Sequence, residues 1–145
     1  MNKKVYNEIS KKIIPKEDKL KNIIISFFVG GTLGLIGQVI VSILIKNGVK
    51  YNDATSIMIV LFIFVSCILT GFGFFDTLVM KAKSGLIIPI TGFAHSITSA
   101  MLEYKNEGYV TGIGANAFKL AGSVILYGVV SAYFFGIIRY LFFGG

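Results

Sequence analysis

Charged residues are scarce in this 145-residue chain, where Asp, Glu, Lys and Arg together make up only 14%. Soluble domains usually carry about 25% charged residues. Acidic residues are the scarcest, with seven Asp and Glu against 14 Lys and Arg, which gives a formal net charge of +7. Hydrophobic residues make up 54%, so few polar side chains remain to cover a soluble core. These shortages exclude a soluble globular domain and indicate an integral membrane protein.

Residue types that bind metals or perform catalysis are also rare. The chain has a single cysteine, Cys67, and a single histidine, His95. One cysteine excludes an internal disulfide, and these two residues do not supply the ligands of a zinc cluster. The sequence does not indicate a catalytic triad of nucleophile, general base and orienting acid. Residues 112–114 (Gly-Ile-Gly) lack the strand and third glycine of a nucleotide-binding loop. We therefore expect no enzyme, no metal and no cofactor.

Basic residues are concentrated ahead of the first apolar run. Seven of them lie in the first 21 positions: Lys3, Lys4, Lys11, Lys12, Lys16, Lys19 and Lys21. A lysine-rich segment beside a membrane span marks the cytoplasmic side, so residues 1–22 are predicted to be a cytoplasmic N-terminal segment. The positive charge therefore indicates membrane orientation and not nucleic-acid binding. The apolar run from Ile23 is too long for the apolar region of a cleaved signal peptide.

Four apolar stretches predict an all-α membrane domain over residues 23–145. The predicted helices cover about 23–45, 55–80, 86–102 and 115–143. A helix needs about 20 residues to cross a hydrocarbon core of roughly 30 Å. The first, second and fourth stretches meet this length, so we expect a multi-pass protein with three to four membrane helices.

The stretch at 86–102 leaves two topologies open. It is short, begins near Pro89 and contains Gly, Ser and Thr. It either spans the membrane or is a broken, re-entrant segment, which survives at membrane depth only where protein or water covers it. Spanning would put the C-terminus in the cytoplasm, and re-entry would put it outside. The glycines Gly108, Gly112 and Gly114 favour re-entry, because they make the connection to the last helix irregular.

Small and polar residues recur every four positions in the first two helices, and such residues share one helix face. In the first helix we expect Gly30, Gly34 and Gln38 to form a helix-packing surface, with Gln38 facing a pore as the alternative. In the second, Ser66 and Thr70 precede Asp76, which we interpret as a solvated or lysine-paired charge at the membrane interface.

The last two helices carry the most polar rows. Ionisable residues inside membrane segments mark substrate paths more often than structural positions. The predicted path residues are Thr91, His95, Ser99, Glu103, Asn116, Lys119, Ser123 and Tyr127. In the alternative interpretation the two rows satisfy each other, and Lys119 either pairs with Glu103 or extends to the interface.

Residues 89–124, which read PITGFAHSITSAMLEYKNEGYVTGIGANAFKLAGSV, resemble the stage V sporulation protein AC family of endospore-forming bacteria. Supporting stretches are Gly30-Gly31, Ile36-Gly37-Gln38, Thr70-Gly71-Phe72-Gly73 before Asp76, and residues 127–133 (YGVVSAY). The similarity extends over roughly residues 23–136. The basic segment ahead of the first span favours this family over the short AE relatives that share part of the pattern.

The resemblance implies a subunit of a complex in the spore inner membrane that moves dipicolinic acid, with calcium, into the developing spore and releases it at germination. It also implies a tension-gated channel activity. Implied partners are the other stage V sporulation AA–AF proteins, including the soluble AD subunit and the small AE membrane subunit, and membrane lipid. Because a chain of this size cannot enclose a path alone, we expect a homo- or hetero-oligomer. The alternative is a non-conducting membrane scaffold subunit of the same complex.

Overall fold

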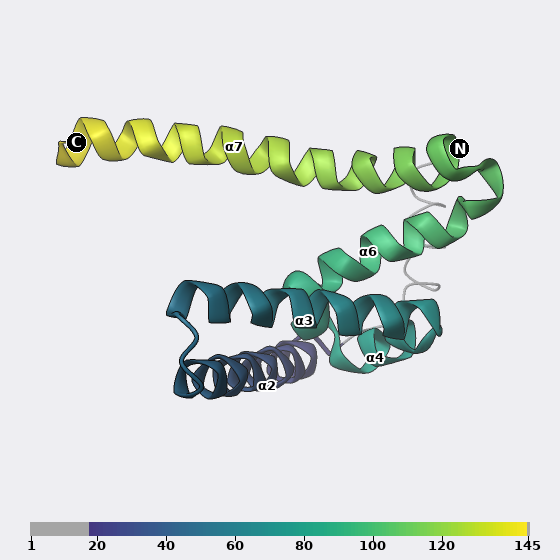
Figure 1. Cartoon of the computed structure of the whole chain (residues 1–145), viewed down its shortest axis with the longest axis horizontal. Helices are drawn as coiled ribbons and strands as arrows, with labels where there is room; N and C mark the ends of the chain where they lie inside the picture. Colours follow the sequence, from purple (N-terminus) through teal and green to yellow (C-terminus); the bar gives the residue numbers. More distant parts are fainter. Residues whose placement is uncertain (1–17, 145) are drawn as a thin grey trace, which may run out of the picture.

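The structure is a computed structural model that describes residues 18–144, and within this range it contains helices and turns but no strand (Figure 1). The predicted all-α fold is therefore confirmed. Most of the predicted cytoplasmic segment, residues 1–17, lies outside the described residues.

Between residues 18 and 144, three helices are long and apolar enough to cross a membrane. They are α2 (Lys19–Lys46), α3 (Tyr51–Gly71) and α7 (Ala115–Phe143), which continues without a break from the π-helical turn η2 (Tyr109–Gly114). At 1.5 Å per residue, even the 21-residue α3 reaches the roughly 30 Å of the hydrocarbon core. The predicted helices 23–45 and 115–143 thus correspond to α2 and α7.

The predicted second helix, 55–80, is divided in two in the structure. It starts earlier, at Tyr51, and ends at Gly71, and a separate helix α4 covers Phe74–Ala82. The break lies at Gly73, whose φ of +76° falls in the left-handed region that glycine adopts without a steric penalty. The chain therefore turns at Gly73 where a continuous helix was expected.

The predicted helix 86–102 is also divided. The short helix α5 covers Ser84–Ile87, and α6 covers Ile90–Glu103 after the break at Pro89. With 14 residues, α6 is about 21 Å long, which is too short to cross a hydrocarbon core of roughly 30 Å. Gly92 is required at the break, because a Cβ there would collide with the backbone of Ile87.

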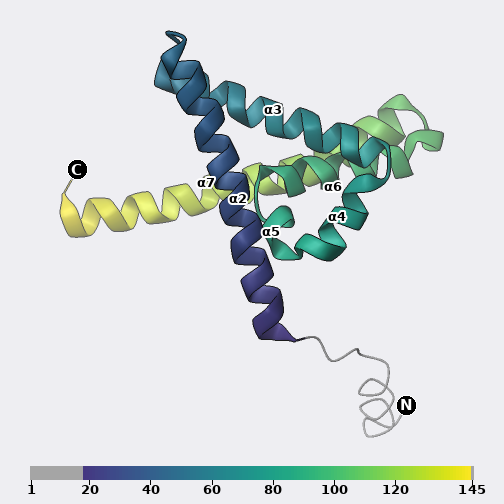
Figure 2. The ribbon, with the colours of Figure 1, turned by 90° about the horizontal axis from the view of Figure 1, so that it is seen from below.

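α6 lies beside α3 and runs in the same direction. Two contacts show the direction, because their residue numbers rise together: the Ser66 hydroxyl bonds to the Thr91 carbonyl oxygen, and the Thr70 hydroxyl lies beside His95 Nδ1. A third bond joins the helices from the Thr98 hydroxyl to the Cys67 sulfur. Because α4 and α5 carry the chain back between them (Figure 2), residues 74–103 form a segment that turns inward and returns. We call residues 74–103 the broken segment, and its geometry favours the re-entrant alternative.

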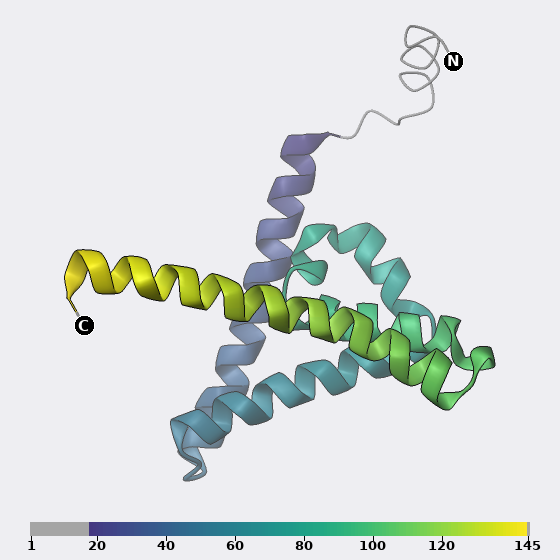
Figure 3. The same cartoon turned by 90° about the horizontal axis from the view of Figure 1, so that it is seen from above.

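α7 contacts the rest of the chain near its N-terminal end, where it meets α6. It follows α6 through η1 (Lys105–Glu107) and η2, and it extends beyond the rest of the molecule at its C-terminal end (Figure 3). No residue of α7 is buried. A 29-residue apolar helix that is exposed over most of its length is stable in lipid or against another protein chain, but not in water.

The predicted packing surface of the first helix is used in part. A Cβ at Gly30 would lie 3.7 Å from the carbonyl oxygen of Gly85, whereas one at Gly34 would meet no atom within 4 Å. The Gln38 amide donates a 3.5 Å hydrogen bond to Ser42 on its own helix. Gly37 lies closer to a neighbouring helix, because a Cβ there would lie 3.4 Å from the Met58 sulfur of α3. Packing at Gly34 stays a prediction that requires a second chain.

We expect Gly85→Ala to destabilise the protein, because its Cβ would lie 2.5 Å from the carbonyl oxygen of Ser26 and 3.0 Å from the amide nitrogen of Gly30. Overpacking of this kind costs about 1–3 kcal/mol. Thermal unfolding in detergent measures the effect. Gly31→Ala is the matched control, since its Cβ meets no atom within 4 Å and alanine favours a helix. Equal unfolding temperatures for the two variants would contradict the contact between α2 and α5.

Three spans and a re-entrant segment predict which side each loop occupies. Single cysteines at Asn47 and Gly144 should lie on one side of the membrane, and one at Asn106 on the other, all tested in a Cys67→Ala background. With the N-terminus in the cytoplasm, an impermeant thiol reagent added to intact cells should label positions 47 and 144 only. Labelling of 106 and protection of 144 and 47 would reverse the orientation. Labelling of 47 and 106 with protection of 144 would show that α6 spans.

Candidate functional site

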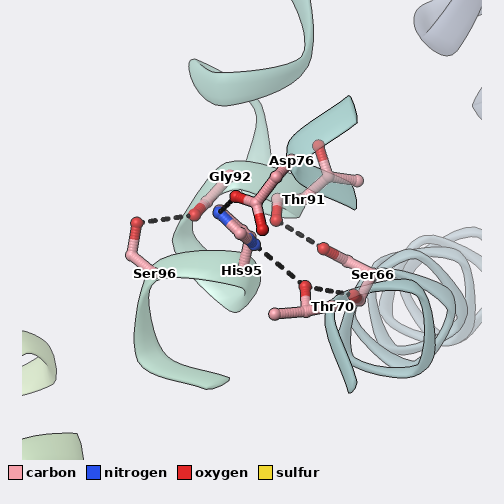
Figure 4. A network of polar contacts seen from close by, with 7 residues as sticks. All are labelled: Ser66, Thr70, Asp76, Thr91, Gly92, His95 and Ser96. Atoms are coloured by element: carbon pink, nitrogen blue, oxygen red, sulfur yellow. Dashed lines mark hydrogen bonds and ion pairs between the residues drawn. The ribbon is translucent and has the colours of Figure 1, made fainter. Parts of the chain in front are cut away.

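Polar side chains from three helices meet where the broken segment joins α3 (Figure 4). Ser66 and Thr70 come from α3, Asp76 from α4, and Thr91 and His95 from α6. We call these five residues the polar joint. Ser66 and Thr70 are one helical turn apart, as are Thr91 and His95, so two matching pairs face each other across the parallel helices.

The inner half of the joint is buried and fully hydrogen-bonded. The Ser66 hydroxyl, 1% exposed, donates to the carbonyl oxygen of Thr91 at 2.6 Å. The Thr91 hydroxyl donates in turn to the carbonyl oxygen of Leu86 at 2.9 Å, which spans the break between α5 and α6. Buried hydroxyl and carbonyl groups are costly without partners. The first bond therefore fixes the broken segment to α3, and the second holds α5 against the start of α6.

His95 forms the outer half of the joint. Its Nδ1 atom lies 3.0 Å from the Thr70 hydroxyl, and its Nε2 atom lies 3.3 Å from a carboxylate oxygen of Asp76. The imidazole ring also stacks on buried Phe75, with ring centres 4.4 Å apart and planes inclined by 20°. Asp76, interpreted from the sequence as an interfacial charge that is solvated or paired with lysine, has 71% of its side chain exposed and so agrees with the solvated alternative, and it also lies beside His95.

The joint can hold His95 in either protonation state. The Thr70 hydroxyl has one proton and lies within reach of two acceptors, His95 Nδ1 and the Ser66 carbonyl oxygen at 2.7 Å. With neutral imidazole, Nε2–H donates to Asp76 and Thr70 donates to Nδ1. With imidazolium, both ring N–H groups donate, and the Thr70 proton turns to the Ser66 carbonyl. Gain of a proton at His95 therefore rotates one hydroxyl without leaving a group unpaired.

The other predicted path residues lie elsewhere. Ser99 and Glu103 continue α6 on its exposed side. In α7, Asn116 donates to the carbonyl oxygen of Gly112 at 2.9 Å and Ser123 to that of Leu120 at 2.8 Å, while Lys119 and Tyr127 are exposed. The structure thus brings Thr91 and His95 together with α3. It leaves Asn116 half-buried at the start of α7 and the remaining five on exposed surfaces of the single chain.

Lys119 and Glu103 form no ion pair with each other in the described part of the chain. Lys119 and Arg139 are separated by 20 positions of one helix, which is about 30 Å at 1.5 Å per residue. This equals the thickness of the hydrocarbon core, so the two cations fit opposite ends of one span. Within a single chain, this spacing favours the alternative that Lys119 extends to the interface.

Sequence reasoning identified Thr91 and His95 but assigned no role in a site to Ser66, Thr70 or Phe75. The signal available was the matching four-residue spacing of Ser66–Thr70 and Thr91–His95. It could not show that the two helices run parallel, because the turn at Gly73 decides this. Between residues 18 and 144, no group of three His, Cys, Asp or Glu side chains is arranged to hold a metal.

We expect Thr70→Val to destabilise the protein by about 1–3 kcal/mol, because it leaves a buried hydrogen-bonding group without its partner while nearly preserving shape. Thr32→Val is the matched control, since the Thr32 hydroxyl bonds only to the Phe28 carbonyl oxygen of its own exposed helix surface. Its effect should stay within about 0.5 kcal/mol. Denaturant unfolding in detergent measures both, and equal losses would argue against a role of the polar joint in stability.

The chain is similar to known proteins over almost its whole length. Residues 22–138 match the model of a family described as SpoVAC/SpoVAEB sporulation membrane protein. Stage V sporulation protein AC of Bacillus subtilis (strain 168) is 42% identical over 144 residues, which cover 97% of this chain and 94% of that protein. No solved structure matches the chain. The resemblance seen in the sequence is confirmed, and the chain belongs to the SpoVAC/SpoVAEB family of sporulation membrane proteins.

Proposed function

We propose that this protein is a channel or transport subunit that moves dipicolinic acid, with calcium, across the spore inner membrane during sporulation and germination. The broken segment carries the proposal. Its short helices hold a polar joint beside α3, a helix long enough to span the membrane. Interrupted helices at membrane depth occur where protein is built around a path or a cavity, and in transporters they form the substrate site.

The chemistry of the solute agrees with this proposal. Dipicolinate is a small, flat dianion, and the free-energy cost of moving it into hydrocarbon without compensating polar groups is prohibitive. A positively biased, hydrated path removes that barrier. Lys119 offers a fixed positive charge, and the start of α6 at Ile90 offers the positive end of a helix dipole.

Assembly is part of the proposal, because one chain does not enclose a path. The row of half-buried Asn116 and exposed Lys119, Ser123 and Tyr127 would surround a conduit if α7 helices from several chains, or from AA–AF partners including the AD and AE subunits, came together. Tension gating fits an α7 that its own chain leaves exposed over most of its length, since lateral stretch of the membrane acts on such a helix directly. The N-terminus is cytoplasmic in this arrangement.

The uncovered surface of α7 also suits the second candidate, a non-conducting scaffold that lends packing surface to a pore formed by others. Liposomes loaded with dipicolinate separate the two functions. A channel subunit releases the solute when the purified protein is present, and more so under tension. A scaffold leaves the liposomes sealed under both conditions, although it still binds its partner subunits.

Charge reversal at Lys119 tests the path. Lys119→Glu should slow dipicolinate release from spores at least tenfold more than Lys119→Gln, because a like charge repels the dianion by several kcal/mol where the effective dielectric is about 20. Lys50→Glu, at an exposed lysine outside both polar rows, is the control. Protein levels are measured for every variant.

Combining Lys119→Glu with Glu103→Lys separates the remaining interpretations. The two residues are not paired within one chain, so the exchange should not restore release. Rescue by the exchange would instead show that they pair between chains. Unchanged release in all variants would remove Lys119 from the path and leave it as an interfacial charge.

A further inference from the structure

An apolar cavity of about 390 Å³ lies between α2, α3 and the broken segment. Leucine, isoleucine, valine and phenylalanine side chains form nearly all of its wall, among them Leu33, Ile36, Leu61, Val65 and Leu78. The polar residues in the wall, Ser66 and Thr91, both spend their hydroxyl protons on backbone carbonyls. The cavity therefore offers no free hydrogen-bond donor and no charge to water or to a dianion, and it is separate from the proposed path.

A second hollow lies at the start of α2 and the end of α4. Its wall includes three lysines, Lys21, Lys81 and Lys83, against one acidic residue, Asp18. The remaining wall residues are neutral. We call this hollow the basic groove. It is a surface suited to a negatively charged group, and it lies next to the lysine-rich N-terminal segment in sequence.

The cavity and the basic groove follow one another along the same two helices. On α4, Leu78 borders the cavity and Lys81 borders the groove, and residues three apart share a helix face. On α2, Ile25 borders the groove and Leu33 borders the cavity, which places the cavity about 12 Å deeper along the helix. The charged hollow thus lies at the end of the span and the apolar hollow lies within it.

We propose that the cavity and the basic groove form one binding site for an anionic phospholipid. The headgroup phosphate contacts Lys21, Lys81 and Lys83 at the membrane surface, and one acyl chain enters the cavity. Water does not fill an apolar cavity without polar partners, so hydrocarbon is the occupant that a bilayer supplies. The volume falls within the range of about 300–1,000 Å³ typical of small-molecule sites. The charge of the groove complements an anionic headgroup and gives no advantage to a zwitterionic one.

The test compares phosphatidylglycerol with phosphatidylcholine of the same acyl chains, added to the purified full-length protein in delipidating detergent. Native mass spectrometry counts the lipids retained. One phosphatidylglycerol should be retained at least tenfold more tightly than phosphatidylcholine. Glycerol phosphate, which has the headgroup charge but no acyl chain, should not bind measurably. Equal retention of the two lipids, or binding of glycerol phosphate alone, would overturn the proposal.

Variants separate the two halves of the site. Lys81→Gln with Lys83→Gln should lower phosphatidylglycerol retention about tenfold towards that of phosphatidylcholine. Lys50→Gln with Lys105→Gln removes the same charge outside both hollows and should change nothing. Equal losses in the two double variants would show non-specific attraction and overturn the site.

Filling the cavity tests the acyl chain. Val65→Phe should weaken retention of both lipids, because the new ring takes the place of the acyl chain. Ile36→Phe fills the same cavity from α2 and replaces Val65→Phe if that variant does not fold. Full lipid retention in a folded cavity-filling variant would place the acyl chain outside the cavity, and a dimer mass in place of bound lipid would assign the cavity to a second copy of the chain.

Discussion

Hydrocarbon cannot satisfy the amide and carbonyl groups that a broken helix leaves open, and this constraint governs the architecture of the protein. The chain interrupts its helices at Gly73 and Pro89, and between these breaks it turns back on itself. The Thr91 hydroxyl binds the Leu86 carbonyl across the second break, and the Ser66 hydroxyl binds the carbonyl of Thr91 from the neighbouring helix. Serine and threonine at these positions supply what water supplies in a soluble protein.

These bonds decide the relative placement of the helices. Because Ser66 and Thr70 meet Thr91 and His95 in the same order, α3 and α6 are parallel, and the chain between them must reverse direction within a short distance. The reversal is possible only where backbones approach closely. Gly85 lies against α2 and Gly92 against the Ile87 backbone, and neither position has room for a Cβ. The polar joint and the close glycine contacts are therefore two parts of one arrangement.

The sequence predicts the parts of this structure that depend on local apolar length. Lys19–Lys46 and Ala115–Phe143 follow from uninterrupted hydrophobic runs, and the resemblance carried by residues 89–124 identifies the family. It does not predict the turn at Gly73, because glycine is common inside membrane helices and only the tertiary contacts show that this one has a positive φ. The pairing of His95 with Asp76 depends on that turn, so the sequence does not predict this pairing either.

The predicted path residues divide along the same physical line. Thr91 and His95 face α3 because the joint holds them there, whereas Ser99, Glu103 and the α7 row beyond Asn116 are exposed. Their surroundings are set by neighbours that a single chain does not contain.

The π-helical turn η2 at the base of α7 has a mechanical consequence. A helix of 29 residues is about 43 Å long, so a tilt of about 10° at its base moves its far end by about 7 Å. Because α7 is so long, a small change of its angle beside α6 produces a large displacement of its far end at the opposite membrane surface.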